Sequence, residues 1–553
     1  MKKSELIQYL DESEEILNSN QIENDILQPR FEDRKKSIRE FSAKILFVGG
    51  FSAGKSALLN AFLGDKEILR ENISPETAIA SELVYGLPEK ITCVNKNSEQ
   101  YDCNFQDIEN FTVEDCYKFI YVLNNDRLKN LNNLIPVDMP GFDSGIEAHN
   151  KALMQYVGDA AAYIFVVDLE KGTVGQSTLD FLDEIKGYSN SISFVLTKRD
   201  KLLPSDVDNV TRNIEETLAE TFEQMPPVLV TSSRDSDCGE KLAAFLNRFS
   251  ADELMLQKLG DKIIVLLRQA VQSMEMQISA LEFNSHDLDI AIQNQERQRD
   301  SVILSLKREK KKLHDSLQLE VPNKILYDVE TALKNQIGML SYSAQQGSTA
   351  FNSTVNNIIR PIILQSTQQH IEASFDEYIG AIVDSQQVNQ PDSIDIANKM
   401  INANNTLSKI AKDGKKYKGI YRAFSTGLAV TTNVIAPWLE LIIIFLPDII
   451  GLLSSLIGQS KEEKLRQSIE YEIIPQICSK LRPEIQESLL KVEEERLTEI
   501  EEEFQTTLDN EIAALQQLKD EKEQRSLNIE QKRADLSEGI RRLEEIIHII
   551  ETA

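Results

Sequence analysis

Residue types suited to binding phosphate and magnesium occur together in one short loop. The loop fits G-x-x-x-x-G-K-[ST] at every position and reads Gly49-Gly50-Phe51-Ser52-Ala53-Gly54-Lys55-Ser56, followed by Ala57. In such a loop, backbone N–H groups surround phosphate oxygens at a helix N-terminus. We expect Lys55 to reach the β- and γ-phosphates and Ser56 to bind Mg²⁺ through its hydroxyl. The alternative is a chance glycine turn between a strand and a helix.

A second motif could complete the magnesium site. The run LIPVDMPG, residues 134–141, ends in D-x-x-G. Asp138 at the end of a strand can hold Mg²⁺ through a water molecule, and the Gly141 amide can meet the γ-phosphate. Thr77 follows Ser56 by about twenty residues and could offer its hydroxyl to Mg²⁺ and its carbonyl to an attacking water. The alternative for Thr77 is an ordinary Ser-Pro-Glu-Thr turn ahead of a strand.

A third motif, T-K-x-D, could recognise the base of a nucleotide. It ends the run SISFVLTKRD with Thr197, Lys198 and Asp200. The Asp200 carboxylate can accept two hydrogen bonds from the N1–H and N2–H₂ edge of guanine, whereas adenine would leave a buried charge unpaired. The Lys198 stem would lie along the base plane, and Ser232 and Ser233, which end the run PPVLVTSS, could close over the base. The three motifs in this order predict a site for GTP or GDP with Mg²⁺.

These residues can meet only if a sheet brings them to one edge. Each motif follows a short apolar run, and further apolar runs occur at 161–168 and 226–231. Buried parallel strands have this pattern, and their carboxyl ends share one edge, where ligands bind in doubly wound folds. We therefore predict an α/β P-loop GTPase head with a doubly wound, mostly parallel sheet, joined to an extended all-α neck and trunk of long antiparallel helices.

The second half of the chain has the pattern of long helices. From Leu254 onward, apolar residues recur at spacings of three and four. The N-terminal segment is also amphipathic, and we expect its apolar face to pack with the final helices; this face carries Leu6, Leu10, Ile16 and Leu17. Pro475 and Pro483 should kink or break the returning helix. The alternative is a charged stalk that serves only as a spacer, and the basic run 307–312 is expected to be a solvated helix face.

Residues 426–458 have the densest apolar composition in the chain. A helix that spans a membrane needs about twenty apolar residues without charge, but Glu440, Asp448 and two prolines interrupt this run. The segment therefore suits a hairpin that dips into one leaflet. The preceding stretch, 412–422, holds five basic residues and one acidic residue, so residues 412–458 predict contact with an anionic membrane surface. The alternative is an αα-hairpin buried in the trunk or in a dimer contact.

Length and composition limit the number of structural units, the partners and the cellular compartment that we expect for the protein. The chain has 553 residues, enough for two or three structural units, and a formal net charge of −29. A phosphate backbone would repel such a chain, so we expect no nucleic-acid partner. The five cysteines are scattered without C-x-x-C spacing, which indicates a reducing compartment without a disulfide frame or a zinc site. The N-terminus lacks the apolar segment of a signal peptide, so we expect a cytoplasmic protein, peripherally associated with a membrane.

Four stretches, GGFSAGKSALLNAFLG, SPETAIASELVYG, VDMPGF and TKRD, together resemble the dynamin superfamily, in particular the bacterial dynamin-like proteins. The resemblance implies a GTPase head on a helical neck built from both chain ends, followed by a helical trunk with a membrane-seeking tip. It also implies heads that pair across the nucleotide, a possible partner dynamin-like protein, and hydrolysis coupled to movement of the neck. The expected units are an N-terminal neck helix at 1–40, the head at 41–250, neck helices at 251–320, the trunk at 321–500 with its tip at 426–458, and C-terminal neck helices at 501–553.

At matching positions, the resemblance gives catalytic roles to Ser52, Lys55 and Thr77. Ser52 would help to seat a monovalent cation or bridge paired heads. Phe51 departs from the family, because eukaryotic dynamins usually carry a glutamine there that helps to position the attacking water. Phenylalanine cannot hydrogen-bond, and Phe142 holds the place where small GTPases have their glutamine, so we expect slow basal turnover. The alternative for Phe51 is simple packing against the next switch.

Two classes of function fit these patterns. A mechanochemical GTPase of the dynamin type would bind or remodel membrane through residues 426–458. A GTP-gated scaffold or assembly protein would use the same segment as a buried or partner-binding hairpin and would touch no bilayer. A ribosomal GTPase is disfavoured by the acidic charge and by the absence of a basic RNA-binding module.

Overall fold

A computed structural model describes the greater part of the chain. The described residues are 1–22, 26–64, 68–69, 79–95, 99–104, 108, 111, 116–141, 160–175, 178–179, 181–182, 191–388, 462–524 and 528–553. Three sequence predictions fall outside them, those for Thr77, Phe142 and the segment 412–458.

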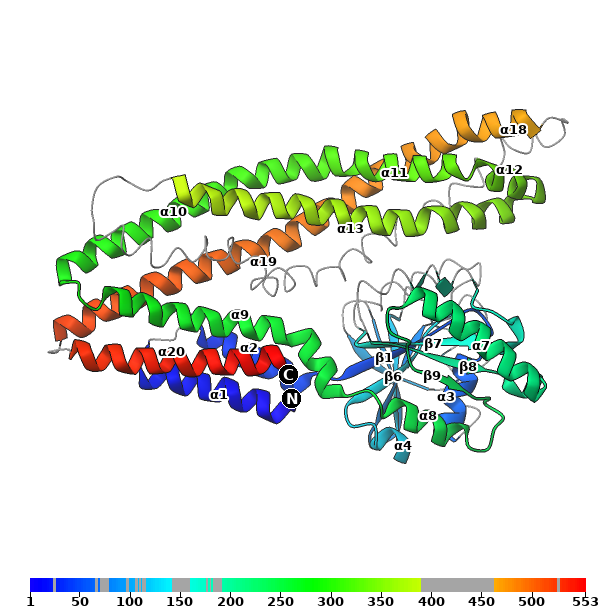
Figure 1. Cartoon of the computed structure of the whole chain (residues 1–553), viewed down its shortest axis with the longest axis horizontal. Helices are drawn as coiled ribbons and strands as arrows, with labels where there is room; N and C mark the ends of the chain where they lie inside the picture. The colour runs from blue at the N-terminus through cyan, green and yellow to red at the C-terminus, as the bar shows by residue number, and fades with distance from the viewer. Residues whose placement is uncertain are drawn as a thin grey trace.

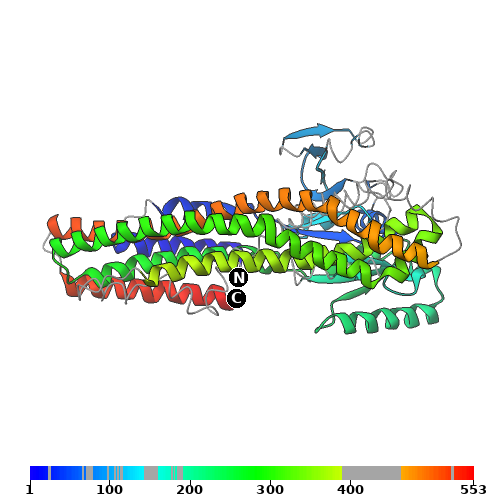
Figure 2. The same cartoon turned by 90° about the horizontal axis from the view of Figure 1, so that it is seen from above.

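The chain forms a head that contains the sheet and two layers of long helices. Figure 1 shows the head beside a bundle of helices that carries both chain ends, with a second helical layer above. Seen from above in Figure 2, the helices of this second layer run the length of the molecule and extend over the head. The predicted combination of an α/β head with long helices is therefore confirmed.

The described residues of the head supply nine strands to one sheet, in the order β4-β3-β5-β2-β6-β1-β7-β8-β9. Strands β6, β1, β7, β8 and β9 run parallel, as predicted. The sheet continues as a mixed extension, because β2 pairs antiparallel with β6, and β3 pairs antiparallel with both β4 and β5. The strands are β1 (Ala43–Val48), β2 (Ala80–Tyr85), β3 (Lys90–Val94), β4 (Gln100–Cys103), β5 (Lys118–Leu123), β6 (Leu134–Asp138), β7 (Ala162–Asp168), β8 (Ile192–Thr197) and β9 (Val228–Val230).

Helices cover both faces of the sheet, which explains why its central strands are apolar without interruption. In β1, Ile45 and Phe47 lie in one core with residues of α3 (Lys55–Leu63) and α8 (Cys238–Leu246). Leu46 and Val48 lie in a second core that includes residues of α7 (Pro204–Thr221). Successive side chains of a strand point to opposite faces, so β1 contributes to both cores.

Both chain ends meet in one helical bundle, which we call the neck bundle. It consists of α1 (Lys3–Ser19), α2 (Gln28–Glu40), α9 (Ala251–Ala280) and α20 (Ile529–Thr552). The apolar face of α1 packs in a core with residues of the other three helices. Figure 1 shows the two termini side by side at the end of this bundle.

The second helical layer, which we call the trunk, is connected to the neck bundle by its longest helix. Its described elements are α10 (Ser285–Asp315), α11 (Val321–Asn335), α12 (Ile337–Gln346), α13 (Ser348–Val388), α18 (Glu462–Ser468) and α19 (Ile474–Gln524). Near its C-terminal end, α19 leaves the trunk and adds Ala514, Leu515 and Leu518 to the core of the neck bundle. None of the described helices combines the length and apolar character that crossing a bilayer requires.

The prolines of the returning helix do not break it. Pro483 lies inside α19, and Pro475 is the second residue of that helix. A five-residue π-helical turn, Ile469–Ile473, directly precedes α19. A second π-helical turn, Ser316–Glu320, occupies the same position before Pro322 in α11. Pro475 and Pro322 therefore each follow a local widening of the helix rather than its end.

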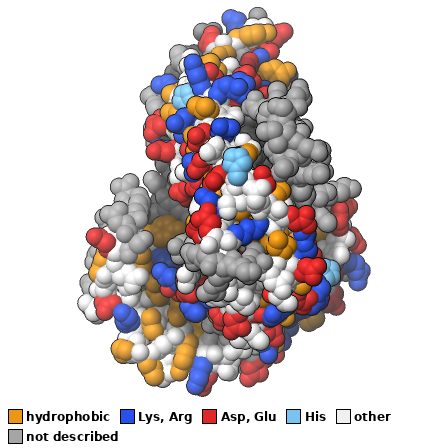
Figure 3. All heavy atoms as spheres, turned by 90° about the vertical axis from the view of Figure 1, so that its left-hand side faces the viewer, with side chains coloured by type: hydrophobic (Ala, Val, Ile, Leu, Met, Phe, Trp, Pro, Cys, Tyr) orange, Lys and Arg blue, Asp and Glu red, His pale blue; other side chains and the backbone are white. Residues whose placement is uncertain are grey.

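The basic run 307–312 lies on α10 and is balanced locally by acids. Arg308 and Lys312 both pair with Glu309, and Lys310 pairs with Glu501 of α19. Figure 3, which looks at the left-hand end of the molecule, shows basic and acidic side chains interspersed over the surface. Such a run acts as a solvated helix face.

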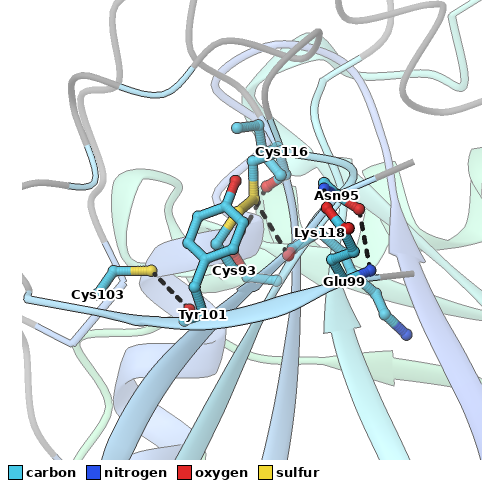
Figure 4. The surroundings of a disulfide bond; sticks show 9 residues. Cys93, Asn95, Glu99, Tyr101, Cys103, Cys116 and Lys118 are labelled. Atoms are coloured by element: carbon cyan, nitrogen blue, oxygen red, sulfur yellow. Dashed lines mark hydrogen bonds between the residues drawn. A yellow bond between two sulfur atoms is a disulfide. The ribbon is translucent and has the colours of Figure 1, made fainter. Parts of the chain in front are cut away.

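Two cysteines of the sheet form a disulfide, which the cysteine spacing did not indicate. Cys93 of β3 and Cys116, two residues before β5, are bonded, with their Cα atoms 5.9 Å apart. Antiparallel pairing of β3 with β5, which sets Val94 opposite Lys118, brings the two cysteines together (Figure 4). The expectation of no disulfide is wrong for this pair, because the contact depends on strand register. The other three cysteines, Cys103, Cys238 and Cys478, are not disulfide-bonded.

Gly539 lies on α20 where the neck helices approach most closely. A Cβ there would be 2.9 Å from Asn20 Nδ2, 3.1 Å from Met274 Sδ and 3.2 Å from Ile16 Cγ2. We therefore expect Gly539→Leu to lower the free energy of unfolding by about 1–3 kcal/mol, as overpacking does. Urea unfolding followed by circular dichroism measures this loss.

The matched control is Gly338→Leu in α12, where a Cβ meets nothing within 4 Å. Leucine is the better helix former by about 1 kcal/mol, so this variant should be as stable as the wild type or slightly more stable. Equal losses in the two variants would show that Gly539 is not at a close helix contact.

Candidate nucleotide-binding site

The sheet brings the three predicted motifs to one edge. In the parallel pairing of β1 with β6, Phe47 lies opposite Asp138, so the glycine-rich loop after β1 begins beside the D-x-x-G motif. In the pairing of β7 with β8, Asp168 lies opposite Thr197, the first residue of T-K-x-D. Because β1 also pairs with β7, all these carboxyl ends are adjacent, as the doubly wound fold requires.

The shape of the glycine-rich loop explains its residue types. Gly54 and Ser52 have φ values of 93° and 61°, in the left-handed region that glycine adopts without strain. A Cβ on Gly49 would clash with the carbonyl oxygen of Val166 in the neighbouring strand β7. A Cβ on Gly141 would lie 2.8 Å from Phe51 Cα. Side chains are thus excluded where the loop passes β7 and where it meets the D-x-x-G motif.

Lys55 is a buried cation that has no acidic hydrogen-bond partner in the described part of the chain. Its Nζ donates to the carbonyl oxygens of Gly49 and Gly50 at 3.0 and 3.3 Å. Burial lowers the pKa of Lys55 to about 8, and the charge of Asp138 opposes that shift only in part. A phosphate at this loop would supply the negative charge that the ammonium group lacks.

Ser56 and Asp138 lie in contact and fit a magnesium site. The Ser56 hydroxyl donates to Asp138 Oδ2 at 2.6 Å, and the buried Oδ1 of the same carboxylate has no hydrogen-bond partner among the described residues. Burial raises the pKa of Asp138 to about 6, against the hydrogen bond from Ser56 and the charge of Lys55. One hydroxyl and one carboxylate with a vacant acceptor match the few protein ligands that Mg²⁺ takes beside phosphate oxygens and water. The described residues contain no group of three or more acidic, histidine or cysteine side chains that could hold a metal alone.

Thr197 connects the base-recognition motif to the phosphate loop. Its Oγ1 donates to the carbonyl oxygen of Ala53 at 2.6 Å and lies 3.2 Å from that of Val167. The next residue, Lys198, has a left-handed backbone with a φ of 59°, and its Nζ donates to Asp168 Oδ2 at 2.7 Å. These contacts hold the lysine stem at the edge where the sequence predicted the base plane.

Asp200 lies at the same edge and is oriented by the loop after β9. Its Oδ1 accepts a hydrogen bond from Ser232 Oγ at 2.5 Å, and its Oδ2 lies 3.4 Å from Arg234 Nη1. The loop itself is fixed by Asp235, which accepts from the Ser232 N–H at 3.0 Å and from Arg199 Nε at 2.6 Å. The carboxylate of Asp200 is therefore presented by a preformed network.

The structure brings most of the predicted site residues together and adds others. The phosphate loop, Asp138, Gly141, Thr197, Lys198, Asp200 and Ser232 share one edge, with Ala57 in the first turn of α3 and Ser233 directly after Ser232. Phe51 is 49% exposed, so half of its side chain is in contact with solvent. The sequence analysis did not identify Asp168 and Asp235 as residues that orient the site, although Asp168 holds Lys198 and Asp235 holds the loop after β9. Asp168 ends the apolar run AAYIFVVD, and its place at a strand end was the signal that could have identified it.

Comparison with known proteins gives one family and several distant relatives. The family model of the dynamin family matches residues 45–199. A bacterial dynamin-like protein of Nostoc punctiforme is 24% identical over 200 residues, which cover 31% of this chain and 27% of that protein. An uncharacterized protein in the xynA 3′ region of Caldicellulosiruptor sp. is 20% identical over 206 residues, which cover 35% of this chain and 49% of that protein. The chain thus matches about half, or less, of the length of these relatives.

Solved structures were compared as well. A structure of an oligomerised bacterial dynamin pair has 13% sequence identity and a TM-score of 0.34, and the match covers 95% of this chain and 91% of that one. Era of Aquifex aeolicus has 16% identity and a TM-score of 0.24, and its match covers 42% of this chain and 68% of that one.

Proposed function

We propose that this chain is a bacterial dynamin-like protein that binds GTP and hydrolyses it slowly to GDP with Mg²⁺. We propose further that nucleotide state and the pairing of two heads control binding or remodelling of a membrane through residues 412–458. The observation that carries the proposal is the meeting of separate motifs at one sheet edge. There Ser56 contacts Asp138, and Thr197 contacts Ala53 of the phosphate loop.

Each part of the site has a proposed role in binding. Lys55 and the loop N–H groups hold the phosphates, Ser56 and Asp138 hold Mg²⁺, and Asp200 accepts from the guanine edge. When bound, Mg²⁺ compensates the negative charge on the β- and γ-phosphate oxygens. Thr197 couples the base end to the phosphate end, because its hydroxyl bonds to the loop carbonyl of Ala53.

Slow hydrolysis follows from the residue types near the terminal phosphate. Phe51 cannot orient a water molecule, and its half-exposed side chain leaves the loop without a polar group at that position. The Thr77 carbonyl and a paired head would then position the water. Ser52, which has a left-handed backbone, would seat a monovalent cation or bridge the heads.

The membrane part of the proposal rests on the sequence of one connecting segment. Residues 389–461 connect α13 to α18 of the trunk, and within them a basic stretch precedes the apolar stretch 426–458. Basic residues next to an apolar segment favour an anionic lipid surface, by about 1 kcal/mol per basic residue.

One experiment tests both parts of the proposal. GTP hydrolysis is measured over a range of protein concentrations, with and without liposomes that contain phosphatidylserine, and the same samples are sedimented. We expect slow turnover that rises with protein concentration and with lipid, and pelleting of the wild type with the liposomes. Leu441→Asp combined with Ile444→Asp should abolish pelleting.

The matched control places two aspartates at exposed leucines elsewhere in the trunk. Leu304→Asp combined with Leu319→Asp makes the same chemical change at side chains that are 67% and 60% exposed, and this variant should pellet like the wild type. If wild type and the variant at residues 441 and 444 pellet equally, the membrane role is wrong. Turnover that depends on protein concentration but not on lipid would favour the GTP-gated scaffold.

A further inference from the structure

One lysine at the nucleotide edge of the head differs from its basic neighbours. Lys198 pairs with Asp168 at 2.7 Å, Lys201 pairs with Glu170 at 2.7 Å, and Arg199 pairs with Asp235 at 2.6 Å. Lys171 forms no hydrogen bond or ion pair with any described residue, although Asp168 and Glu170 are close to it in sequence. The two acids closest to Lys171 in sequence are thus engaged by other cations, and its ammonium group has no counterion among the residues that the structure describes.

The backbone places Lys171 beside the phosphate loop. It ends the 3₁₀ turn Leu169–Lys171 that follows β7. The turn begins where Asp168 Oδ1 accepts from the Glu170 N–H at 3.0 Å, and it closes at Gly172, whose φ is 73°. Both ends of the turn are therefore fixed, and its position relative to the loop is set by the pairing of β7 with β1.

The ammonium group of Lys171 lies over Gly50. Its Nζ is 3.7 Å from the position that a Cβ on Gly50 would take. Lys55 Nζ also contacts Gly50, through the carbonyl oxygen at 3.3 Å. Two lysine ammonium groups, one buried and one exposed, therefore flank the same loop residue, and neither has an acidic hydrogen-bond partner among the described residues.

The Gly50 part of the loop is the end at which a terminal phosphate would lie. A Cβ on Gly141 would meet Phe51 Cα, Phe51 N and the Gly50 carbonyl carbon at 2.8 to 3.3 Å. Gly141 is the D-x-x-G residue whose amide is expected to meet the γ-phosphate. Gly141 and Lys171 thus both approach Gly50, whereas Asp200 and Ser232 lie at the end of the site proposed to hold the base.

We propose that Lys171 is a second phosphate-binding lysine, which contacts the terminal phosphate of a bound nucleoside triphosphate and distinguishes it from a diphosphate. The inference rests on the proposed GTP binding. An ammonium without a counterion, beside a loop that binds anions, has a phosphate oxygen as its natural partner. Lys171 also supplies a positive charge beside Gly50, next to Phe51, whose side chain has no polar group. This charge comes from the same head and not from a paired one.

Isothermal titration calorimetry with two ligands tests the proposal without relying on turnover. The wild type and the variant Lys171→Gln are each titrated with the non-hydrolysable analogue GMPPNP and with GDP, both in the presence of Mg²⁺. We expect Lys171→Gln to bind GMPPNP about 10- to 100-fold more weakly, the value of one hydrogen bond to a charged group. Its affinity for GDP should change less than about twofold, because GDP lacks the phosphate that Lys171 contacts.

Two further variants serve as controls. Lys171→Arg keeps the positive charge and should retain most of the preference for GMPPNP. Lys241→Gln removes a lysine that pairs with Asp237 on α8 and should bind both ligands like the wild type.

The possible results separate the inference from the proposed function. If the wild type binds guanine nucleotides and Lys171→Gln binds GMPPNP equally well, Lys171 is only a solvated surface lysine. If Lys171→Gln weakens both ligands alike, the lysine does not recognise the terminal phosphate. If the wild type binds neither ligand, the proposed function and the role of Lys171 both fail.

Discussion

Replacing Asp200 by asparagine should lower the affinity for GDP by about 10⁴-fold and create affinity for xanthosine diphosphate. In the proposed site the wild-type carboxylate would accept hydrogen bonds from guanine N1–H and N2–H₂. An asparagine amide would instead place its own N–H group against one of these two donor groups. Xanthine has a carbonyl in place of the 2-amino group and can accept from that amide. The variant keeps one oxygen to accept the hydrogen bond from Ser232 Oγ, so the loop after β9 should remain in place. Calorimetric titration with both diphosphates measures the switch.

The control for this switch is Asp206→Asn. Asp206 is an exposed acid in the first turn of α7, so the substitution makes the same change in charge outside the base pocket. It should leave both affinities at their wild-type values. If Asp200→Asn binds GDP as tightly as the wild type does, Asp200 does not recognise guanine and the base end of the site has been misassigned.

Replacing Lys55 by methionine should have opposite effects on binding and on stability. The affinity for GDP should fall by about 10³-fold, because Lys55 makes charge-assisted hydrogen bonds to phosphate oxygens. The nucleotide-free protein should become more stable. A pKa near 8 instead of 10.5 corresponds to about 3 kcal/mol of cost for burying the ammonium group. Loss of the Lys55 hydrogen bonds to the carbonyl oxygens of Gly49 and Gly50 offsets part of that gain, so we expect about 1–2 kcal/mol of net stabilisation.

The pH dependence identifies the cause of this stabilisation. Between pH 8 and 10.5 the unfolded chain keeps the Lys55 proton that the folded protein has lost, so the cost of burial disappears as the pH rises through this range. Urea unfolding in EDTA at pH 7 and at pH 9.5 should therefore show a stability difference between variant and wild type that shrinks at the higher pH. Lys241→Met, on the surface of α8, should show no such difference. A Lys55→Met protein that is less stable than the wild type at pH 7 would contradict the assignment of Lys55 as an uncompensated buried cation.

The sequence predicted those parts of the site in which a functional motif directly adjoins the strand or helix that positions it. The loop from Gly49 to Ser56 has a strand before it and a helix after it, so motif and position could be identified together. Asp138 and Asp200 each end an apolar run, and parallel strands bring such ends to one edge. For these residues, the order of apolar runs and motifs along the sequence was sufficient to predict their place in the fold.

Contacts between separate strands could not be predicted in the same way. The ion pair of Lys198 with Asp168 and the disulfide of Cys93 with Cys116 both depend on register, which the local pattern does not specify. The position of Lys171 over Gly50 depends on a three-residue turn after β7. The helix α19 continues through Pro483, because packing of the neighbouring Leu481 and Ile485 in the trunk core outweighs the local preference of proline to end a helix.

The length of α19 has a mechanical consequence. Its 51 residues at 1.5 Å per residue make a rod of about 75 Å. One end of this rod is embedded among the helices that carry the two chain termini, and the other reaches the far part of the trunk. A tilt of about 5° at the embedded end would displace the opposite end by about 6 Å, so a small repacking at the embedded end is amplified by leverage into a displacement as large as one helical turn.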